Sequence, residues 1–393
     1  MKLFKFIYFL FLAVFYFLAL PILLLLLFKK KYQASIPARF FYLQPEPLSD
    51  REIWLHACSF GEVKSLTPII EKMLKNDKKI LLTTTTQTGH TLAQEFVKKG
   101  DCQVLYLSFE LYLPLWKKRL KKLERLIVVE SELWFMLFEV AKSLGARTFL
   151  INARIADWSF EKYLRLKFYY SRIFALIDRV FAQANADALR LEALGAKGVE
   201  VFGNLKIYTK IKATKRYEKP QKNLIVAGST HPMEEKIVLR AFLEFKKQNP
   251  DSLLVLAPRH PERFDEIYHS LSGHKVGRIS IDGINEEQDI LLLDVLGELN
   301  NIYRIADVVI LCGSFIKAGG HNPLEPASFG VKLLSGPYIF NQYALFDCIE
   351  GYTFVQDGKD LCQKLLDYEN LPKSKIKAQR TNLDGLVAEL LDG

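Results

Sequence analysis

The sequence has few features that would indicate a metalloprotein or a disulfide-bonded scaffold. Its 393 residues include five cysteines, which are widely spaced and form no Cys-x-x-Cys pair. None of its seven histidines lies in a His-Glu-x-x-His motif, and an Asp-x-Asp motif is also missing. These absences exclude a disulfide framework and a zinc knuckle, favour a reducing compartment, and lead us to expect no dedicated metal site.

Acidic residues are missing from the first 31 positions, which contain five lysines. The net charge of the whole chain is +10, so half of the excess lies in this short segment. The rest is too weakly basic to require nucleic acid as a partner, although it suits an anionic membrane or an anionic substrate. Half of the residues are apolar, and a folded chain of this length usually divides into two domains.

Residues 6–28 form one uncharged, apolar run that includes Pro21. A helix of this length reaches across a bilayer core of about 30 Å, so we interpret residues 1–31 as a membrane anchor. A cleaved signal peptide, with its shorter apolar region of about 7–15 residues, is the alternative. A shallow insertion kinked at Pro21 also stays open. The lysines at 29–31 slightly favour a cytoplasmic location for the body of the protein.

Short β-rich segments alternate with amphipathic segments from about residue 50 onward, which is typical of parallel sheets covered by helices. Seven strands are expected in the first half, at 53–57, 80–86, 103–107, 126–130, 148–153, 179–184 and 199–203. Five more are expected in the second half, at 223–229, 253–258, 289–294, 308–314 and 332–337.

A charged, proline-containing stretch at 208–222 separates the two halves and is expected to be a linker. The predicted fold is therefore α/β, with two doubly wound Rossmann-like domains that face a cleft, at 32–207 and 223–393. The last twenty residues are expected to form an amphipathic helix that closes the second domain. Open α/β sheets bind ligands at the carboxyl ends of their strands, so we looked for functional residues there.

In the first half, polar residues follow three of the expected strands. The motif HACSFGE ends in Glu62, which is either a general base or only a helix-start residue that complements the helix dipole. The motif ESELW places Glu130 and Glu132 on the same side of the chain if the strand continues. Lys206 ends the motif GNLK; alone it is weak evidence, since most lysines are simply solvated.

In the second half, the patterns indicate an anion-binding site. The motif GSTH and the motif APRHPERF both follow apolar runs, and Arg259 with His260 would offer donors at a helix start that contains Pro261. The glycine-rich segment 313–320 leads to Asn322, Pro323 and Glu325 at another expected helix start. Glycines let backbone N–H groups approach an anion, and an acid nearby can accept a ribose hydroxyl.

Taken together and in this order, the motifs HACSFGE, TTTTQTG, ESELW, NAR, LGA with VFGNLK, STH, PRHPERF, GEL and GSFIKAGGHNPLEPA resemble those of the bacterial 3-deoxy-D-manno-oct-2-ulosonic acid (Kdo) transferases. The resemblance extends over nearly the whole chain. It implies a GT-B fold and an inverting, metal-independent glycosyltransferase without a cofactor. It also implies CMP-Kdo as donor and the tetra-acylated lipid A precursor as acceptor, at the cytoplasmic face of the inner membrane, with no nucleic acid partner.

The resemblance also assigns roles to individual residues. Glu62 would be the base that deprotonates the acceptor hydroxyl, and Glu130 and Lys206 would support the transition state. The residues expected to contact CMP are Pro258, Arg259, Leu296, Gly297, Glu298, Asn322, Pro323, Leu324 and Glu325.

The chain departs from the family pattern at two places, both in the acceptor half. Ser108 and Glu110 stand in a segment where the family has Pro and Asp, and Phe135 replaces a proline after Trp134. These departures leave the acceptor preference open. The basic stretch 117–125 is either a contact for anionic lipid or a solvated helix face. Two other functions stay open as alternatives. One is a GT-B lipid glycosyltransferase with another nucleotide-sugar donor, and the other is a nucleotide-sugar binder without turnover.

Overall fold

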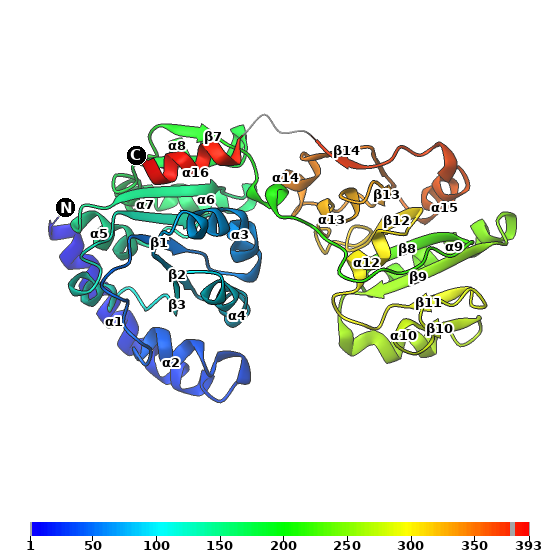
Figure 1. Ribbon diagram of the computed structural model, residues 1–393, viewed down its shortest axis with the longest axis horizontal. Helices are drawn as coiled ribbons and strands as arrows, with labels where there is room; N and C mark the ends of the chain where they lie inside the picture. Colours follow the sequence, from blue (N-terminus) through cyan, green and yellow to red (C-terminus); the bar gives the residue numbers. More distant parts are fainter. Residues whose placement is uncertain (1, 378–381, 393) are drawn as a thin grey trace. The chain divides into compact units, whose positions relative to one another are not determined.

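The computed structural model describes residues 2–377 and 382–392, which form two compact units (Figure 1). The first unit extends to Thr209 and also contains the C-terminal helix, and the second begins at Lys210. Each unit is an α/β domain built on its own sheet of seven parallel strands. The predicted fold class is therefore confirmed.

The sheet of the first unit has the strand order β3-β2-β1-β4-β5-β6-β7. The chain starts at β1, adds strands on one side and then continues from β4 on the other, so the order reverses between β1 and β4. All seven strands predicted for this half are present: β1 (Ile53–His56), β2 (Ile80–Thr84), β3 (Cys102–Tyr106), β4 (Arg125–Val129), β5 (Arg147–Ala153), β6 (Arg179–Ala182) and β7 (Val199–Val201).

Helices cover both faces of this sheet, so its strands are buried on both sides. Ile53 and Leu55 of β1 contribute to one apolar core and Trp54 to the other, because successive side chains point to opposite faces. This double burial explains why the strands read as continuous apolar runs. The helices are α3 (Phe60–Lys75), α4 (Gln87–Ala93), α5 (Phe135–Ser143), α6 (Asp157–Arg165), α7 (Lys167–Phe174) and α8 (Asn185–Ala193).

The sheet of the second unit has the order β10-β11-β9-β8-β12-β13-β15, which reverses between β8 and β12. The five predicted strands are β8 (Asn223–Thr230), β9 (Ser252–Pro258), β11 (Ile290–Leu292), β12 (Val308–Leu311) and β13 (Lys332–Ser335). Two edge strands were not predicted, β10 (Val276–Arg278) and β15 (Tyr352–Phe354); each has three residues, which is too short for a recognisable pattern. A short antiparallel pair, β14 (Ile349–Glu350) and β16 (Lys375–Ile376), lies outside this sheet.

The helices of the second unit are mostly short. Among the described residues of this unit, only α9 and α15 have more than two full turns, and they pack against each other. The full set is α9 (Glu234–Gln248), α10 (Phe264–Ser270), α11 (Ile279–Asp282), α12 (Leu299–Tyr303), α13 (Leu324–Ala327), α14 (Tyr343–Phe346) and α15 (Gly358–Leu366).

The C-terminal helix α16 (Leu383–Asp392) corrects one expectation. It was predicted to close the second domain, but it packs against α3 of the first unit, where Leu386, Val387 and Leu390 complete the apolar core. The apolar stripe of this helix can be read from the sequence. The surface that covers the stripe cannot, because it depends on the path of the chain between the two units. Residues 378–381 and 393 of the expected helix lie outside the described residues.

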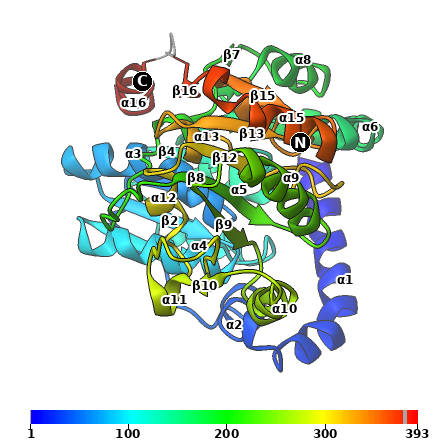
Figure 2. The ribbon, with the colours of Figure 1, turned by 90° about the vertical axis from the view of Figure 1, so that its right-hand side faces the viewer.

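The N-terminal helix α1 (Lys2–Leu26) is long and apolar enough to cross a membrane and leaves most of its side chains exposed. One side of it nevertheless packs on the first unit (Figures 1 and 2). The rings of Phe4 and Tyr8 stack edge-on against Phe135, and the Tyr8 hydroxyl donates a hydrogen bond of 2.5 Å to Glu110. The short helix α2 (Ser35–Phe40) follows and contacts β3. The expected anchor is thus attached to the body by aromatic and polar contacts.

Candidate active site

The candidate active site of the first unit lies where the strand order of its sheet reverses. His56 at the end of β1 pairs with Val128 of β4, so the segments that follow these two strands leave the sheet side by side. One is the segment 57–62 and the other is 130–134. Such a reversal point is where open α/β sheets bind ligands, and here it brings two of the predicted motifs together.

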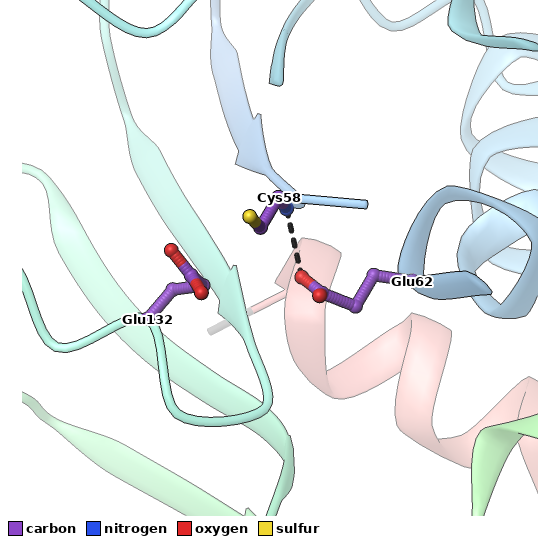
Figure 3. A group of neighbouring side chains, drawn as sticks. All are labelled: Cys58, Glu62 and Glu132. Atoms are coloured by element: carbon purple, nitrogen blue, oxygen red, sulfur yellow. Dashed lines mark hydrogen bonds between the residues drawn. The ribbon is translucent and has the colours of Figure 1, made fainter. Parts of the chain in front are cut away.

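Glu62 stands in the first turn of α3, with its carboxylate held by two donors. Ser59 is the N-cap of the helix; its hydroxyl donates to Oε1 of Glu62 (2.8 Å), and the backbone N–H of Cys58 donates to Oε2 (2.7 Å; Figure 3). This arrangement is a variant of a capping box, so Glu62 has the structural role that its position suggested. Each oxygen keeps a second lone pair, so the contacts are compatible with proton transfer.

The surroundings of Glu62 weaken its acidity. Burial raises the pKa of this carboxyl to about 7, and the negative charges of Glu130 and Glu132 contribute to the increase. A carboxylate with a pKa near neutrality is well matched to general-base work at physiological pH. The geometry therefore supports both readings of Glu62, helix capping and a base, at the same time.

Glu132 completes an acidic cluster with Glu62 and Cys58. Its Oε2 accepts from the Trp134 indole (2.7 Å) and lies 3.6 Å from Nε2 of His56. Burial would raise the pKa of Glu132, but His56 and the indole outweigh it and hold the pKa below its usual range. The thiol of Cys58 has a pKa raised to about 12, chiefly by burial and then by Glu132, so it stays protonated.

Ligand atoms of Cys58, Glu62 and Glu132 all lie within 4.8 Å of one another, as Figure 3 illustrates. Among the described residues this is the one group of three that could hold a metal ion. Its two carboxylates already accept hydrogen bonds from the protein, and the mechanism below uses no ion.

The third predicted group, Lys206, also reaches this region. Its Nζ lies 4.0 Å from Oε1 of Glu130, so the ammonium partly neutralises the acidic cluster. Glu130 has a left-handed backbone with φ of 57°, which is uncommon for a residue with a side chain. Such strain tends to persist where the surroundings impose a functional geometry. The structure thus brings Glu62, Glu130 and Lys206 into one neighbourhood.

A network of amides positions Lys206. Asn204 caps the 3₁₀ turn that carries Lys206, and its amide donates to Gln183 (3.0 Å). Asn152 at the end of β5 accepts from the backbone N–H of Leu205 (3.0 Å). Because these residues are far apart in the chain, only the resemblance of the motifs NAR and VFGNLK hinted that they act together.

The second unit has a comparable site at its own reversal point, between β8 and β12. Glu234, which is fully buried, accepts from the backbone N–H groups of His231 (2.9 Å), Gly313 (2.7 Å) and Phe315 (3.0 Å). It therefore joins the loop after β8 to the glycine-rich loop after β12. The sequence analysis missed Glu234, although a Glu three residues after a strand-end histidine is the spacing of a capping residue.

Basic and aromatic groups gather around these loops. His231 and His321 stack, with their Nε2 atoms 2.9 Å apart, and His260 packs edge-on against His231. Burial, together with the nearby charges of His231 and Arg259, lowers the pKa of His321 to about 4. Arg259 itself is exposed at the end of β9. His321 is therefore uncharged at neutral pH, and Arg259 offers this end of the unit positive charge for an anionic ligand.

Of the two predicted helix starts, the one at Pro261 is present, since its three-residue 3₁₀ turn continues directly into α10. The other is shorter than expected, because α13 has only four residues, beginning after Asn322 and Pro323. Asn322 accepts from the backbone N–H of Leu324 (3.1 Å), and its amide donates to Glu325 (3.4 Å). A single turn has a weak dipole, so any anion here would depend on loop N–H groups and on side chains such as Arg259.

The three residues of the predicted segment 296–298 differ in their exposure and in their contacts. Leu296 is exposed, and Gly297 has a φ of 83°. The carboxylate of Glu298 is occupied within the unit by Lys215 (2.7 Å), Asn301 (2.7 Å) and Tyr217 (3.1 Å). Glu298 therefore holds the segment after Lys210 in place, and Leu296 and Gly297 are the more accessible of the three.

Comparisons with known proteins show which family the chain resembles. Residues 34–209 match the family described as 3-deoxy-D-manno-octulosonic-acid transferase (kdotransferase). The chain is 32% identical over 371 residues to the 3-deoxy-D-manno-octulosonic acid transferase of Aquifex aeolicus, covering 91% of this chain and 98% of that one. It is 28% identical over 370 residues to the enzyme of the same name from Haemophilus influenzae, covering 89% and 86%.

Among solved structures, the UDP-GlcNAc 2-epimerase of Neisseria meningitidis bound to UDP-GlcNAc has a TM-score of 0.56 at 14% identity, covering 82% of this chain and 95% of that one. A glycosyltransferase from Rickettsia africae has a TM-score of 0.53 at 12% identity, covering 81% and 88%. At such identities these neighbours show the fold alone, which is of the GT-B type. The extent of the match to the Aquifex aeolicus enzyme shows more: the chain belongs to the family of 3-deoxy-D-manno-octulosonic acid (Kdo) transferases.

Proposed function

We propose that the protein transfers Kdo from CMP-Kdo to a hydroxyl of the tetra-acylated lipid A precursor, with inversion at the anomeric carbon. The observation that carries this proposal is Glu62: a carboxyl with a pKa of about 7 at the strand-order reversal, beside Glu130 and Glu132. Family membership supports the transfer of Kdo, and the remaining details rest on the chemistry of the residues.

In the first step, Glu62 accepts the proton of the acceptor hydroxyl. The hydroxyl oxygen forms a bond to the anomeric carbon of Kdo on the face opposite the phosphate. The bond between that carbon and the phosphate oxygen breaks, and its electron pair leaves with CMP. Attack and departure on opposite faces produce inversion. Glu130 and Lys206 support this step, since their 4.0 Å contact offers one cation close to the base.

The leaving group requires positive charge, which the second unit supplies. CMP carries a phosphate, and Kdo carries a carboxylate, so the donor is strongly anionic. We assign CMP binding to Pro258 and Arg259, to the segment 296–298 and to the segment 322–325. Glu234 accepts from the N–H groups of Gly313 and Phe315, so these two donors are not offered to the phosphate; their bonds instead fix the course of the glycine-rich loop before the ligand arrives.

We further propose that the protein acts at the cytoplasmic side of the inner membrane, with α1 as its anchor. The support is the length and apolar character of α1, followed by the lysines at 29–31. The basic stretch 117–125 lies in the same unit and adds charge that anionic head groups would attract.

The variant Glu62→Gln tests the mechanism. It keeps the size of the side chain but cannot take a proton, so we expect a loss of turnover of about a hundredfold or more, with CMP-Kdo affinity retained. The control is Glu71→Gln, a carboxyl on the exposed part of the same helix. Mass analysis of the lipid product and equilibrium binding of CMP-Kdo give the two readouts. Near-normal turnover in Glu62→Gln would remove Glu62 from the reaction.

A further inference from the structure

The first unit contains a groove of about 900 Å³ to which the proposed reaction assigns no role. It lies between the C-terminal part of α1, the helix α2 and the segment from the end of β2 into α4. Ligand pockets are typically about 300–1,000 Å³, so this groove has room for a large part of a lipid-sized molecule.

The wall formed by α1 and α2 is apolar. Leu23 and Leu26 from α1 and Ile36 and Phe40 from α2 line it. A hydrophilic ligand would gain nothing from these side chains, whereas each methylene of an alkyl chain buried against them contributes about 0.8 kcal/mol. The groove therefore fits a hydrocarbon chain at this wall.

The groove also carries charge at its edge. Lys31 and Arg39 line it together with one acid, Glu95, so the balance favours an anionic group. Arg39 donates to the carbonyl of Leu107 (3.1 Å), which orients its guanidinium. Burial lowers the pKa of Arg39, and the negative charge of Glu132 opposes that shift, so the guanidinium lies close to the acidic cluster. Apolar walls with cations at the edge suit an amphiphile with a phosphorylated head group.

One end of the groove lies close to the segment that carries Glu62, although Glu62 itself does not line the groove. Phe60 lines the groove and is only two residues before Glu62 in α3. Thr85 also lines it, and its hydroxyl lies 2.6 Å from the thiol of Cys58, whose backbone N–H donates to Glu62. A molecule that fills the groove would therefore present its polar end beside the acidic cluster.

We propose that this groove binds an acyl chain of the lipid acceptor, with Lys31 and Arg39 contacting the acceptor's phosphate. The inference rests on the proposed function for the identity of the acceptor. It gives α1 a second role beyond anchoring, because Leu23 and Leu26 form part of the binding wall. Deletion of residues 1–31 would consequently weaken acceptor use as well as membrane association.

The test places a bulky side chain in the groove from its exposed rim. Thr91 on α4 lines the groove and is exposed, so Thr91→Trp fills space without disturbing the core. The matched control is Gln94→Trp, an exposed residue immediately after α4 that does not line the groove. We expect Thr91→Trp to raise the KM for the tetra-acylated acceptor tenfold or more and to leave the CMP-Kdo dissociation constant unchanged. Gln94→Trp should change neither value.

A second measurement does not depend on turnover. An acceptor with a diazirine on one acyl chain, irradiated with the wild-type protein in detergent micelles, should label residues of α2 or α4. Labelling of α2 or α4 without Kdo transfer would refute the proposed function but would support lipid binding in the groove. If Thr91→Trp transferred Kdo with an unchanged KM for the acceptor, the groove proposal would be wrong. Labelling only outside the groove would have the same meaning. In both cases the proposed transferase activity would still stand.

Discussion

The two units use the same sheet topology to build sites of different chemistry. Each sheet reverses its strand order next to its first strand, and each collects its polar residues there. In the first unit the collected residues are acids, and their mutual repulsion and burial raise the pKa of Glu62. In the second they are histidines and arginine, and burial with neighbouring cations lowers the pKa of His321. The fold thus supplies the position of a site, and the loop residues determine its chemistry.

The largest effect is expected at Glu234, which holds the second site together. Glu234→Ala removes the acceptor of three backbone N–H groups, and each buried donor left unpaired costs about 1–3 kcal/mol. We expect the free energy of unfolding of this unit to fall by several kcal/mol and CMP-Kdo binding to be lost. Chemical denaturation and equilibrium binding measure both. The exposed neighbour Lys236→Ala is the control, and a stable Glu234→Ala that binds the donor normally would contradict this role.

The pH dependence of activity tests the acidic site. Glu62 acts as a base only when ionised, and its pKa is about 7. We expect kcat/KM to fall about tenfold per pH unit below pH 7 and to level off above it. Measuring CMP-Kdo affinity over the same range separates this effect from titration of the histidines in the second unit. A profile that is already flat at pH 5 would show that Glu62 is not the titrating group.

The basic site is tested by Arg259→Gln. Hydrogen bonds to a charged group contribute about 1.5–3 kcal/mol, so we expect donor affinity to fall by about ten- to a hundredfold. The KM for the acceptor and the pH profile assigned to Glu62 should stay unchanged, because these belong to the other unit. Arg240→Gln, an exposed arginine on α9, is the matched control. If Arg259→Gln impaired only the use of the acceptor, the assignment of donor binding to the second unit would be wrong.

The smallest effect is expected at Glu110, which joins α1 to the first unit. Burial raises the pKa of this carboxyl to about 7, above its value of about 4.3 in an unfolded chain. The folded state therefore favours the protonated form, and stability falls as pH rises from about 4.3 to 7. Glu110→Gln should make this slope shallower in urea denaturation between pH 5 and 7.5, and the part that remains is expected from Glu62, whose pKa is also about 7. An unchanged slope in the variant would show that Glu110 does not contribute to it.

Much of the fold follows from patterns that are local in the chain. The seven strands of the first sheet were all predicted, because burial on both faces produces continuous apolar runs such as those at 80–84 and 125–129. The edge strands β10 and β15 were missed because three residues carry too little pattern. The C-terminal helix was assigned to the wrong domain, because an apolar stripe does not state which surface will cover it.

The residues of the candidate site also fall into those that the sequence could predict and those that it could not. Glu62, Glu130, Lys206 and Arg259 could be named from strand-end motifs and from the resemblance of those motifs to a family. Asn152 and Gln183 could not, since each acts through a hydrogen bond to a residue that is distant in the chain. Glu234 has the local spacing of a capping residue, but its bonds to Gly313 and Phe315 on another loop could not be predicted.

By itself, the sequence determined the order of strands and helices, the apolar character of α1 and the family, because these depend on residue types and spacing within short segments. Only the tertiary structure decided that Glu62 both caps α3 and is perturbed toward neutral pKa, and that α1 forms one wall of a groove beside it. Burial and charge repulsion depend on which atoms become neighbours, and that is a property of the folded chain.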